Sequence, residues 1–329
     1  MDKSQKPVEV LSAYLSDDLD KVGTLIQERM RSKNAPRIPE VTAHLVNAGG
    51  KRLRPMLTLA SAAICGYGGP YHIHLAATVE FIHTATLLHD DVVDESGQRR
   101  GRPTANLLWD NKSSILVGDY LFSRSFQLMV ETGSIRVLDI LANASATIAE
   151  GEVLQLTAAE NIETDEATYI QVVKGKTAAL FAAAMEVGGE ISGVDEATKR
   201  ALWDFGDALG VSFQIVDDLL DYTGTDATGK NIGDDFRERK LTPPVIKAIA
   251  NATDEERAFW TRVIEKGDQR DGDLEHALAL FAKYDTLGAT RKDAIHWSDI
   301  AKEALNALPE HPLRDTLSDI ADYVVERIL

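Results

Sequence analysis

Two acidic pentapeptides of the same pattern are the residues best suited to chemistry in this sequence. Asp90-Asp91-Val92-Val93-Asp94 and Asp217-Asp218-Leu219-Leu220-Asp221 both read D-D-x-x-D. Residues four apart lie on one face of a helix, so the first and last aspartates of each motif point the same way. Carboxylates at that spacing repel one another and destabilise a helix. A pair of such motifs therefore indicates a site for cations.

The surroundings of both motifs support a magnesium site. Each motif ends a long apolar stretch, residues 79–88 and 205–216, so the carboxylates stand at the rim of an apolar interior. Oxygen ligation with few protein ligands per ion suits Mg²⁺ that also binds phosphate. The alternative is two acidic helix ends left to water. A di-iron site is disfavoured because no Glu-x-x-His pair accompanies the aspartates.

Basic residues occur where a phosphate group could be held. In an otherwise acidic chain, arginine suits bidentate contacts to phosphate and lysine provides a point charge. For any one of these side chains alone, a surface salt bridge is the simpler explanation. Gly175-Lys176-Thr177 lacks the preceding glycine-rich turn of a P-loop, which disfavours a nucleotide phosphotransferase. The candidates for a diphosphate cradle are Lys51, Arg52, Arg54, Arg99, Arg100, Lys174, Lys176, Lys230, Arg239 and Lys240.

The composition excludes several classes of protein. Among the 329 residues, 35 Lys and Arg stand against 52 Asp and Glu, a net charge of −17, which argues against nucleic acid as a partner and against a polybasic membrane anchor. Cys65 is the single cysteine, so no intramolecular disulfide can form. The mostly apolar stretch 75–88 is too short to span a bilayer, and residues 1–10 do not read as a signal peptide. We expect a cytoplasmic protein.

The spacing of helix breakers predicts an all-α fold in a single domain spanning residues 1–329. Ten prolines occur in the chain, and none lies between Thr104 and Thr242. Helix-start signals include a capping box formed by Thr253 and Glu256 and an entry at Thr164–Asp165. Residues 201–222 are apolar around most of their helical circumference, which predicts a helix in the middle of a bundle.

Residues 87–101 resemble the first aspartate-rich motif of the trans-polyprenyl diphosphate synthases, and residues 209–221 resemble the second. The Gly-Gly-Lys-Arg-Leu-Arg-Pro element at 49–55, the Lys176–Thr177 pair and segment 230–244 extend the resemblance over most of the chain. It implies an isoprenoid-synthase-type helical bundle around a deep central apolar cavity, usually in a homodimer. The sequence departs from the family's frequent E-G-K-x-T-L-P pattern at Arg239 and Pro243.

The resemblance also implies the substrates and the residues that bind them. Isopentenyl diphosphate would be added to an allylic diphosphate, farnesyl or geranylgeranyl, with two or three Mg²⁺ ions. The ligands of Mg²⁺ would be Asp90, Asp94 and Asp217, with Asp91, Asp218 and Asp221 nearby. Isopentenyl diphosphate would be bound by Lys51, Arg54, His83 and Arg100, although His83 alone also fits a core histidine. The allylic diphosphate would be bound by Arg99, Lys176, Thr177, Gln214, Lys230 and Lys240.

Small residues before the first motif favour a long product. Each helical turn rises ~5.4 Å, roughly one prenyl unit, and by resemblance short-chain enzymes block the first turn with aromatic residues. Ala85 and Thr86 are small, so a tail can pass toward Ile82 and Val79, with Phe122, Phe126 or Met129 as a deeper floor. We predict a product of about C40–C50, suited to quinone side chains and delivered to a membrane. The alternatives are a C15–C20 product and ordinary helix packing at Ala85.

Two further functions remain open from the sequence. A terpene cyclase shares the first motif, but it would carry a different metal motif in place of Asp217–Asp221 and would not need Lys51, Arg54 and Arg100 for a second diphosphate. A noncatalytic regulatory subunit of a heteromeric synthase typically lacks one aspartate motif, whereas both are whole here. Activity without a partner protein would separate these possibilities.

Overall fold

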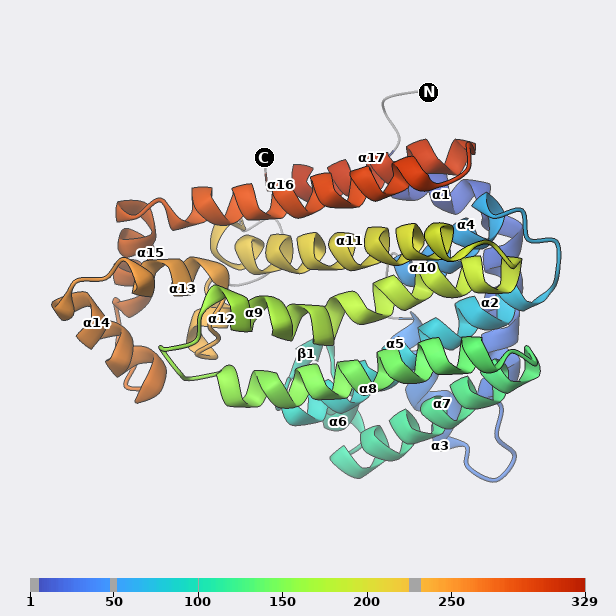
Figure 1. The fold of residues 1–329 in the computed structure, drawn as a ribbon. Coiled ribbons are helices and arrows are strands. Elements are labelled where there is room, and N and C mark those ends of the chain that lie inside the picture. The colour runs from blue at the N-terminus through green and yellow to red at the C-terminus, as the bar shows by residue number, and fades with distance from the viewer. Residues whose placement is uncertain (1–5, 48–51, 100, 225–231, 329) are drawn as a thin grey trace. The chain divides into compact units, whose positions relative to one another are not determined.

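The structure is a computed structural model that describes residues 6–47, 52–99, 101–224 and 232–328. These residues are mostly helical with almost no strand, which confirms the all-α prediction (Figure 1). Within them, the strands are two-residue segments, β1 (Gln98–Arg99) and β2 (Arg102–Pro103), paired antiparallel. This short hairpin follows the first aspartate motif directly.

Contacts within the chain divide it into two compact units. The first comprises residues 1–145, 180–203 and 307–317. Its longest complete helix, α5, packs along α7 and also contacts α4 and α2. The helices that lie mainly in this unit are α1 (Pro7–Tyr14), α2 (Ser16–Met30), α3 (Arg37–Asn47), α4 (Leu53–Ile64), α5 (Tyr71–Val93), α6 (Ala105–Leu108), α7 (Asn111–Glu131) and α10 (Ala179–Ser192).

The second unit comprises residues 146–179, 204–306 and 318–329. Besides α10, whose first residue lies in the second unit, the helices that contribute residues to both units are α8 (Ile135–Ala158), α11 (Glu196–Thr223) and α17 (Pro312–Glu326). The other elements of the second unit are α9 (Glu166–Val173), the π-helix η1 (Lys174–Ala178), α12 (Asp234–Arg237), α13 (Pro243–Ala250), α14 (Asp254–Trp260), the π-helix η3 (Thr261–Glu265), α15 (Asp273–Lys283), α16 (Thr286–Ala304) and the 3₁₀ turn η4 (Leu305–Ala307). The single domain over 1–329 stays a prediction.

The predicted helix starts are confirmed by side-chain caps. Thr253 Oγ1 accepts a hydrogen bond from the Glu256 N–H, and the Glu256 carboxylate accepts one from the Thr253 N–H. The Asp165 carboxylate accepts from the Thr168 N–H at the start of α9. Each cap satisfies donors that the first helical turn leaves unpaired, which explains why these helices begin where the sequence indicates.

The helices that carry the aspartate motifs bury most of their apolar side chains. In α5, Leu75, Val79 and Ile82 are wholly buried. In α11, Phe205, Leu209 and Val216 are wholly buried, whereas Phe213 and Leu220 are partly exposed. The prediction of a central apolar helix over 201–222 is thus confirmed. Among the described helices, none has both the length and the apolar character needed to cross a bilayer.

Candidate active site

The first aspartate motif lies at the C-terminal end of α5, in the first unit. Its three aspartates differ in burial: Asp90 is partly buried, Asp91 is wholly buried, and Asp94, the residue that follows the helix, is exposed. Arg99 from β1 donates to Asp91 Oδ1 from Nε at 2.8 Å and approaches it with Nη2 at 2.7 Å. Asp91 is therefore held inward by an arginine, and the two flanking aspartates lie closer to water.

Arg54 and His83, expected to bind isopentenyl diphosphate, lie together in the first unit. Arg54 on α4 places Nη1 3.2 Å from His83 Nε2 on α5. The Arg54 guanidinium also lies over the Phe181 ring, 4.3 Å from its centroid, which holds the cation by a cation–π contact. The other two residues expected to bind this substrate, Lys51 and Arg100, lie outside the described residues.

The second aspartate motif ends α11, in the second unit. Its second aspartate is again the most buried of the three. Asp218 is 7% exposed, whereas the Asp217 side chain is 45% exposed. Asp221 is buried, and its Oδ2 accepts from the Asp235 N–H at 3.1 Å. Arg327 on the segment that follows α17 lies 3.8 Å from Asp217 Oδ1. The carboxylates of this motif are thus held at different depths.

A chain of hydrogen bonds joins three of the predicted site residues. Thr177 Oγ1 donates to Gln214 Oε1 at 2.9 Å, and Gln214 Nε2 donates to Asp218 Oδ1 at 2.8 Å. The hydroxyl of Tyr169 donates to the other carboxylate oxygen, Asp218 Oδ2, at 2.6 Å. The structure thus brings Thr177, Gln214 and Asp218 into one hydrogen-bonded cluster, to which Tyr169 also belongs.

The predicted lysines of the second unit are paired with carboxylates. Lys176 Nζ lies 2.9 Å from Glu152 Oε2 on α8. Lys240 Nζ lies 3.4 Å from Asp235 Oδ1 and is also paired with Glu238. Lys230, expected to bind the allylic diphosphate with them, lies outside the described residues.

Burial strongly perturbs the carboxylates around the second motif. Desolvation, followed by repulsion from Asp235, raises the pKa of the Asp218 carboxyl to about 8, although the hydrogen bonds from Tyr169 and Gln214 lower it. Desolvation also raises the pKa of Asp235 against the opposing effect of Lys240. A positive charge near these groups would favour their ionised forms, so their chemistry fits a divalent cation.

A π-helix presents Lys176 and Thr177. Residues 174–178 widen into a π-helical turn between α9 and α10, a distortion common at functional sites. Here η1 touches α8 through two glycines: a Cβ at Gly151 would lie 2.6 Å from the Lys176 nitrogen, and one at Gly175 would lie 2.8 Å from the Gly151 Cα. Only glycine permits this approach, which brings α8 against the backbone of Lys176.

The positions expected to control product length lie on α5. Ala85 and Ile82 are wholly buried, and Thr86 is partly buried with its hydroxyl donating to the His83 carbonyl at 2.9 Å. Of the residues considered for a deeper floor, Met129 on α7 is buried, whereas Phe126 is 44% exposed. Phe126 instead lines an open surface groove.

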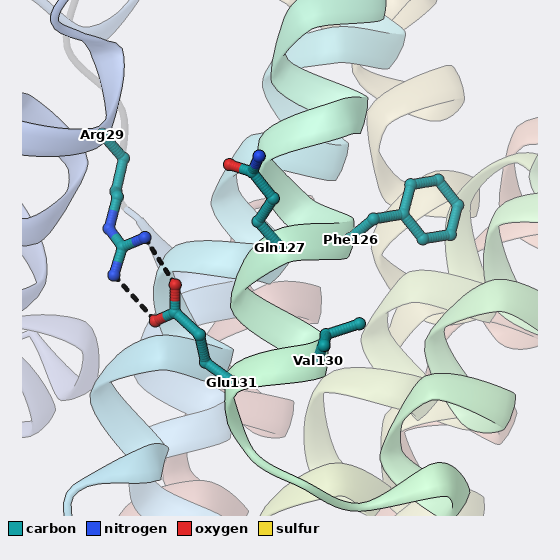
Figure 2. A pocket seen from close by; sticks show the side chains of 5 residues that line it. All are labelled: Arg29, Phe126, Gln127, Val130 and Glu131. Atoms are coloured by element: carbon teal, nitrogen blue, oxygen red, sulfur yellow. Dashed lines mark hydrogen bonds and ion pairs between the residues drawn. The ribbon is translucent and has the colours of Figure 1, made fainter.

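That groove, of about 520 Å³, lies between α2 and α7. It is lined by Arg29, Phe126, Gln127, Val130 and Glu131. Figure 2 shows Phe126 and Val130 projecting from α7, while the Arg29 guanidinium binds both carboxylate oxygens of Glu131, at 2.6 and 2.7 Å. Because Arg29 and Glu131 pair with each other, the groove presents mainly an apolar surface.

Sequence reasoning did not identify Tyr169, Glu152 and Asp235, which contact the predicted residues. Tyr169 reads as a core residue because it shares a helical face with Val172 and Val173. Asp235 follows the second motif by 14 residues and could have been suspected from the acidic pair Asp234–Asp235. Glu152 gives no such signal, since isolated glutamates are common on helices.

Comparison with known proteins assigns the chain to a family. The polyprenyl synthetase family model matches residues 35–281. Octaprenyl diphosphate synthase of Escherichia coli (strain K12) is 40% identical over 321 residues, covering 97% of this chain and 99% of that protein. A crystal structure of decaprenyl diphosphate synthase from Rhodobacter capsulatus is 70% identical, with a TM-score of 0.95, and covers 98% of this chain and 99% of the other.

A third relative was crystallised with ligands. The polyprenyl synthase from Caulobacter crescentus CB15, complexed with calcium and isoprenyl diphosphate, is 47% identical with a TM-score of 0.92, and the match covers 98% of each chain. The family model and these full-length similarities agree with the two aspartate motifs and with the helical fold. The chain therefore belongs to the polyprenyl synthetase family of prenyltransferases.

Proposed function

We propose that this chain adds isopentenyl diphosphate units in trans to an allylic diphosphate and releases a polyprenyl diphosphate of about C40–C50. The observation that carries this proposal is the presence of two whole D-D-x-x-D motifs in a family member, each with its second aspartate buried and held by side-chain donors. The similarity to octaprenyl and decaprenyl diphosphate synthases favours the long product. Quinone side chains are the use that such a length suits.

The basic residues of the site would divide between two diphosphates. Arg54 and His83, which lie together on α4 and α5, would bind isopentenyl diphosphate with Lys51 and Arg100. The allylic diphosphate would be bound by Arg99, Lys176, Thr177, Gln214, Lys230 and Lys240. Because Lys176, Lys240 and Arg99 are paired with carboxylates, binding would exchange or share these ion pairs with the phosphate oxygens.

A divalent cation fits the carboxylates of both motifs. Among the described residues, no group of three or more His, Cys, Asp or Glu side chains is arranged to hold a metal ion alone. A cation bound by Asp90 and Asp94, or by Asp217, would thus take its remaining ligands from the diphosphate and from water, as Mg²⁺ prefers. Two or three Mg²⁺ ions would neutralise the diphosphate and make it a better leaving group.

The protein's own residues would bind, orient and shield the reactants. Lysines and arginines would hold the departing diphosphate as its C–O bond breaks, and the allylic cation would be attacked by the double bond of isopentenyl diphosphate. Loss of a proton then restores an allylic product longer by one five-carbon unit. Apolar side chains such as Ile82 and Val79 would exclude water from the cation and accommodate the growing tail.

Product length would be controlled from α5. Ala85 and Thr86 leave the first turn below the motif without an aromatic block, so the tail could extend toward Ile82. Tyrosine at position 85 would add a ring at this wholly buried position. We expect Ala85→Tyr to shorten the product to about C15–C20, as read by chromatography of the dephosphorylated prenols. Unchanged product length would contradict this assignment and favour ordinary helix packing at Ala85.

The chain would act as a homodimer through an apolar face of α7. Ile115, Leu116, Phe126 and Val130 on this helix are 42%, 66%, 44% and 65% exposed. Exposed large apolar side chains gathered on one helix indicate an interaction site. The groove of Figure 2, which Phe126 and Val130 line, belongs to the same face.

The central experiment incubates purified protein with farnesyl diphosphate, labelled isopentenyl diphosphate and Mg²⁺, beside an EDTA control. The proposal expects elongation that depends on Mg²⁺ and ends at about C40–C50. A product ending at C15–C20 would support the short-chain alternative. Folded protein that does not elongate would refute the synthase and favour a regulatory subunit of a heteromeric enzyme.

A further inference from the structure

Tyr169 makes a short, buried hydrogen bond to the second aspartate motif. It is not among the residues assigned to bind substrate or metal. It lies on α9, 49 residues before Asp218, and its hydroxyl donates to Asp218 Oδ2 at 2.6 Å. Tyr169 is 8% exposed and Asp218 is 7% exposed, so water competes little with the bond. A divalent cation at the motif would favour the ionised form of Asp218, and a hydrogen bond to an ionised acceptor is about twice as strong as a neutral one.

The bond completes the coordination of the Asp218 carboxylate by protein donors. Oδ1 accepts from Gln214 Nε2, and Oδ2 accepts from Tyr169. The Thr177 hydroxyl donates to Gln214 Oε1, which directs the Gln214 amide nitrogen toward Asp218. With one donor on each oxygen, the carboxylate is fixed in its plane, and the Gln214 and Thr177 side chains are fixed with it.

The first motif also holds its second aspartate, but through one carboxylate oxygen and with a different donor. Asp91 occupies the same place in its motif as Asp218, is also buried, and is held by Arg99. In both motifs the second aspartate is anchored inward. In the second motif, however, one of the two anchors is a tyrosine, a donor that stays neutral because burial and nearby carboxylates raise its pKa well above the ordinary value.

We propose that Tyr169 is a positioning residue of the prenyl-transfer site, whose hydroxyl fixes Asp218, Gln214 and Thr177 in the orientation that binds the allylic diphosphate with its divalent cation. This inference rests on the proposed function. It assigns Tyr169 no contact with substrate: the residue acts through Asp218. Removing the hydroxyl should therefore weaken binding of the allylic diphosphate and of Mg²⁺ and leave binding of isopentenyl diphosphate unchanged.

The test compares Tyr169→Phe with Tyr284→Phe by calorimetric titration of Mg²⁺ and the unreactive thio analogue of farnesyl diphosphate. Tyr284 is a matched control, since its hydroxyl donates to Glu256 Oε2 at the same 2.6 Å in the same unit and contacts none of the assigned site residues. We expect the dissociation constant of the analogue to rise about tenfold in Tyr169→Phe and to equal that of wild type within measurement error in Tyr284→Phe.

A double-mutant cycle tests whether Tyr169 acts through Asp218. In an Asp218→Asn background, the tenfold effect of Tyr169→Phe on analogue binding should largely disappear. In steady-state assays, Tyr169→Phe should raise the KM for farnesyl diphosphate and the Mg²⁺ requirement, with the KM for isopentenyl diphosphate unchanged. A merely structural role would move all of these together, and that result would overturn the proposal.

A second variant covers the case in which Tyr169→Phe does not fold. Tyr169→3-fluorotyrosine keeps the ring and makes the hydroxyl a stronger donor, so analogue binding should change by about twofold; unchanged binding would overturn the inference. The activity of the wild-type protein separates an error in the proposed function from an error in the role of Tyr169. If it fails to elongate farnesyl diphosphate, the proposed function is wrong; if it elongates and the Tyr169 variants bind like wild type, only the inference is wrong.

Discussion

The second aspartate of each motif is the one most removed from water, and this has consequences at the scale of single residues. Asp91 is wholly buried and Asp218 nearly so, whereas Asp94 is exposed and the Asp217 side chain is 45% exposed. A buried carboxylate is stable only when donors or cations compensate its lost hydration. The anchoring residues therefore contribute to stability as well as to the site.

Arg99→Ala should destabilise the protein by about 2 kcal/mol, because it leaves the buried Asp91 carboxylate without its guanidinium partner. Among the described residues, Asp91 Oδ2 already has no hydrogen-bond partner. Urea unfolding measures the change. Arg237→Ala is the control: Arg237 and Asp234 form an ion pair with side chains 48% and 47% exposed, which should be worth less than about 0.5 kcal/mol. Equal losses in both variants would contradict the argument.

Cys65 should be almost unreactive at neutral pH. Burial raises the pKa of its thiol to about 11, so at pH 8 only about one molecule in a thousand carries the reactive thiolate. Because the thiol has a higher pKa in the folded than in the unfolded state, it stays neutral up to high pH in the folded protein. The free energy of unfolding therefore falls as pH rises between the unfolded and folded pKa values. Labelling by a disulfide reagent should be slow in the native protein and fast in urea. Fast native labelling would refute the shift.

The sequence predicts most residues of the candidate site, but not the side chains that hold them. Asp217, Asp218 and Gln214 lie within one helical stretch, so their motif is local and visible. Tyr169 was missed because it meets Asp218 across 49 residues, and such a contact depends on how α9 packs against α11. Lys176 was predicted as a binder of phosphate, yet its pairing with Glu152 also depends on tertiary packing.

At the scale of elements, the π-helix η1 and its contact with α8 decide where Lys176 and Thr177 lie. The sequence predicted a helix through this region but not its widening, because a π-helical turn changes the spacing of one turn and leaves the apolar pattern nearly intact. Arg239 is a similar case: its backbone is left-handed, with φ of 58°, which accounts for the glycine that the family often has there.

Gly151→Ala should displace η1, since the new methyl group would lie 2.6 Å from the Lys176 nitrogen. Because a backbone atom is harder to displace than the end of a side chain, we expect the free energy of unfolding to fall by about 2 kcal/mol. We also expect a several-fold higher KM for farnesyl diphosphate. Gly23→Ala in α2 is the control, because its Cβ would have no neighbour closer than 3.9 Å. It should be neutral or stabilising by up to about 1 kcal/mol. If both variants behaved alike, the glycine contact would not matter.

At the scale of the whole molecule, the exposed apolar face of α7 is unexplained by the fold of one chain. Ile115, Phe122, Phe126 and Val130 recur at helical spacing along this face, and those at 115, 126 and 130 are substantially exposed. The sequence could not single out this face, because the opposite side of α7, with Leu121 and Leu128, is equally apolar. Burial in the structure separates the two sides.

Val130→Glu should convert the proposed homodimer into monomers. Val130 is 65% exposed, so the substitution should leave the chain folded. A carboxylate buried without a partner at the interface would destabilise the dimer by several kcal/mol, because the two-fold symmetry places one such carboxylate on each subunit. Light scattering after gel filtration measures the mass. Tyr14→Glu adds the same charge at another exposed residue, 55% exposed on α1, and should leave the dimer intact. A wild-type monomer, or a dimer that survives Val130→Glu, would show that the α7 face does not join two copies of this chain.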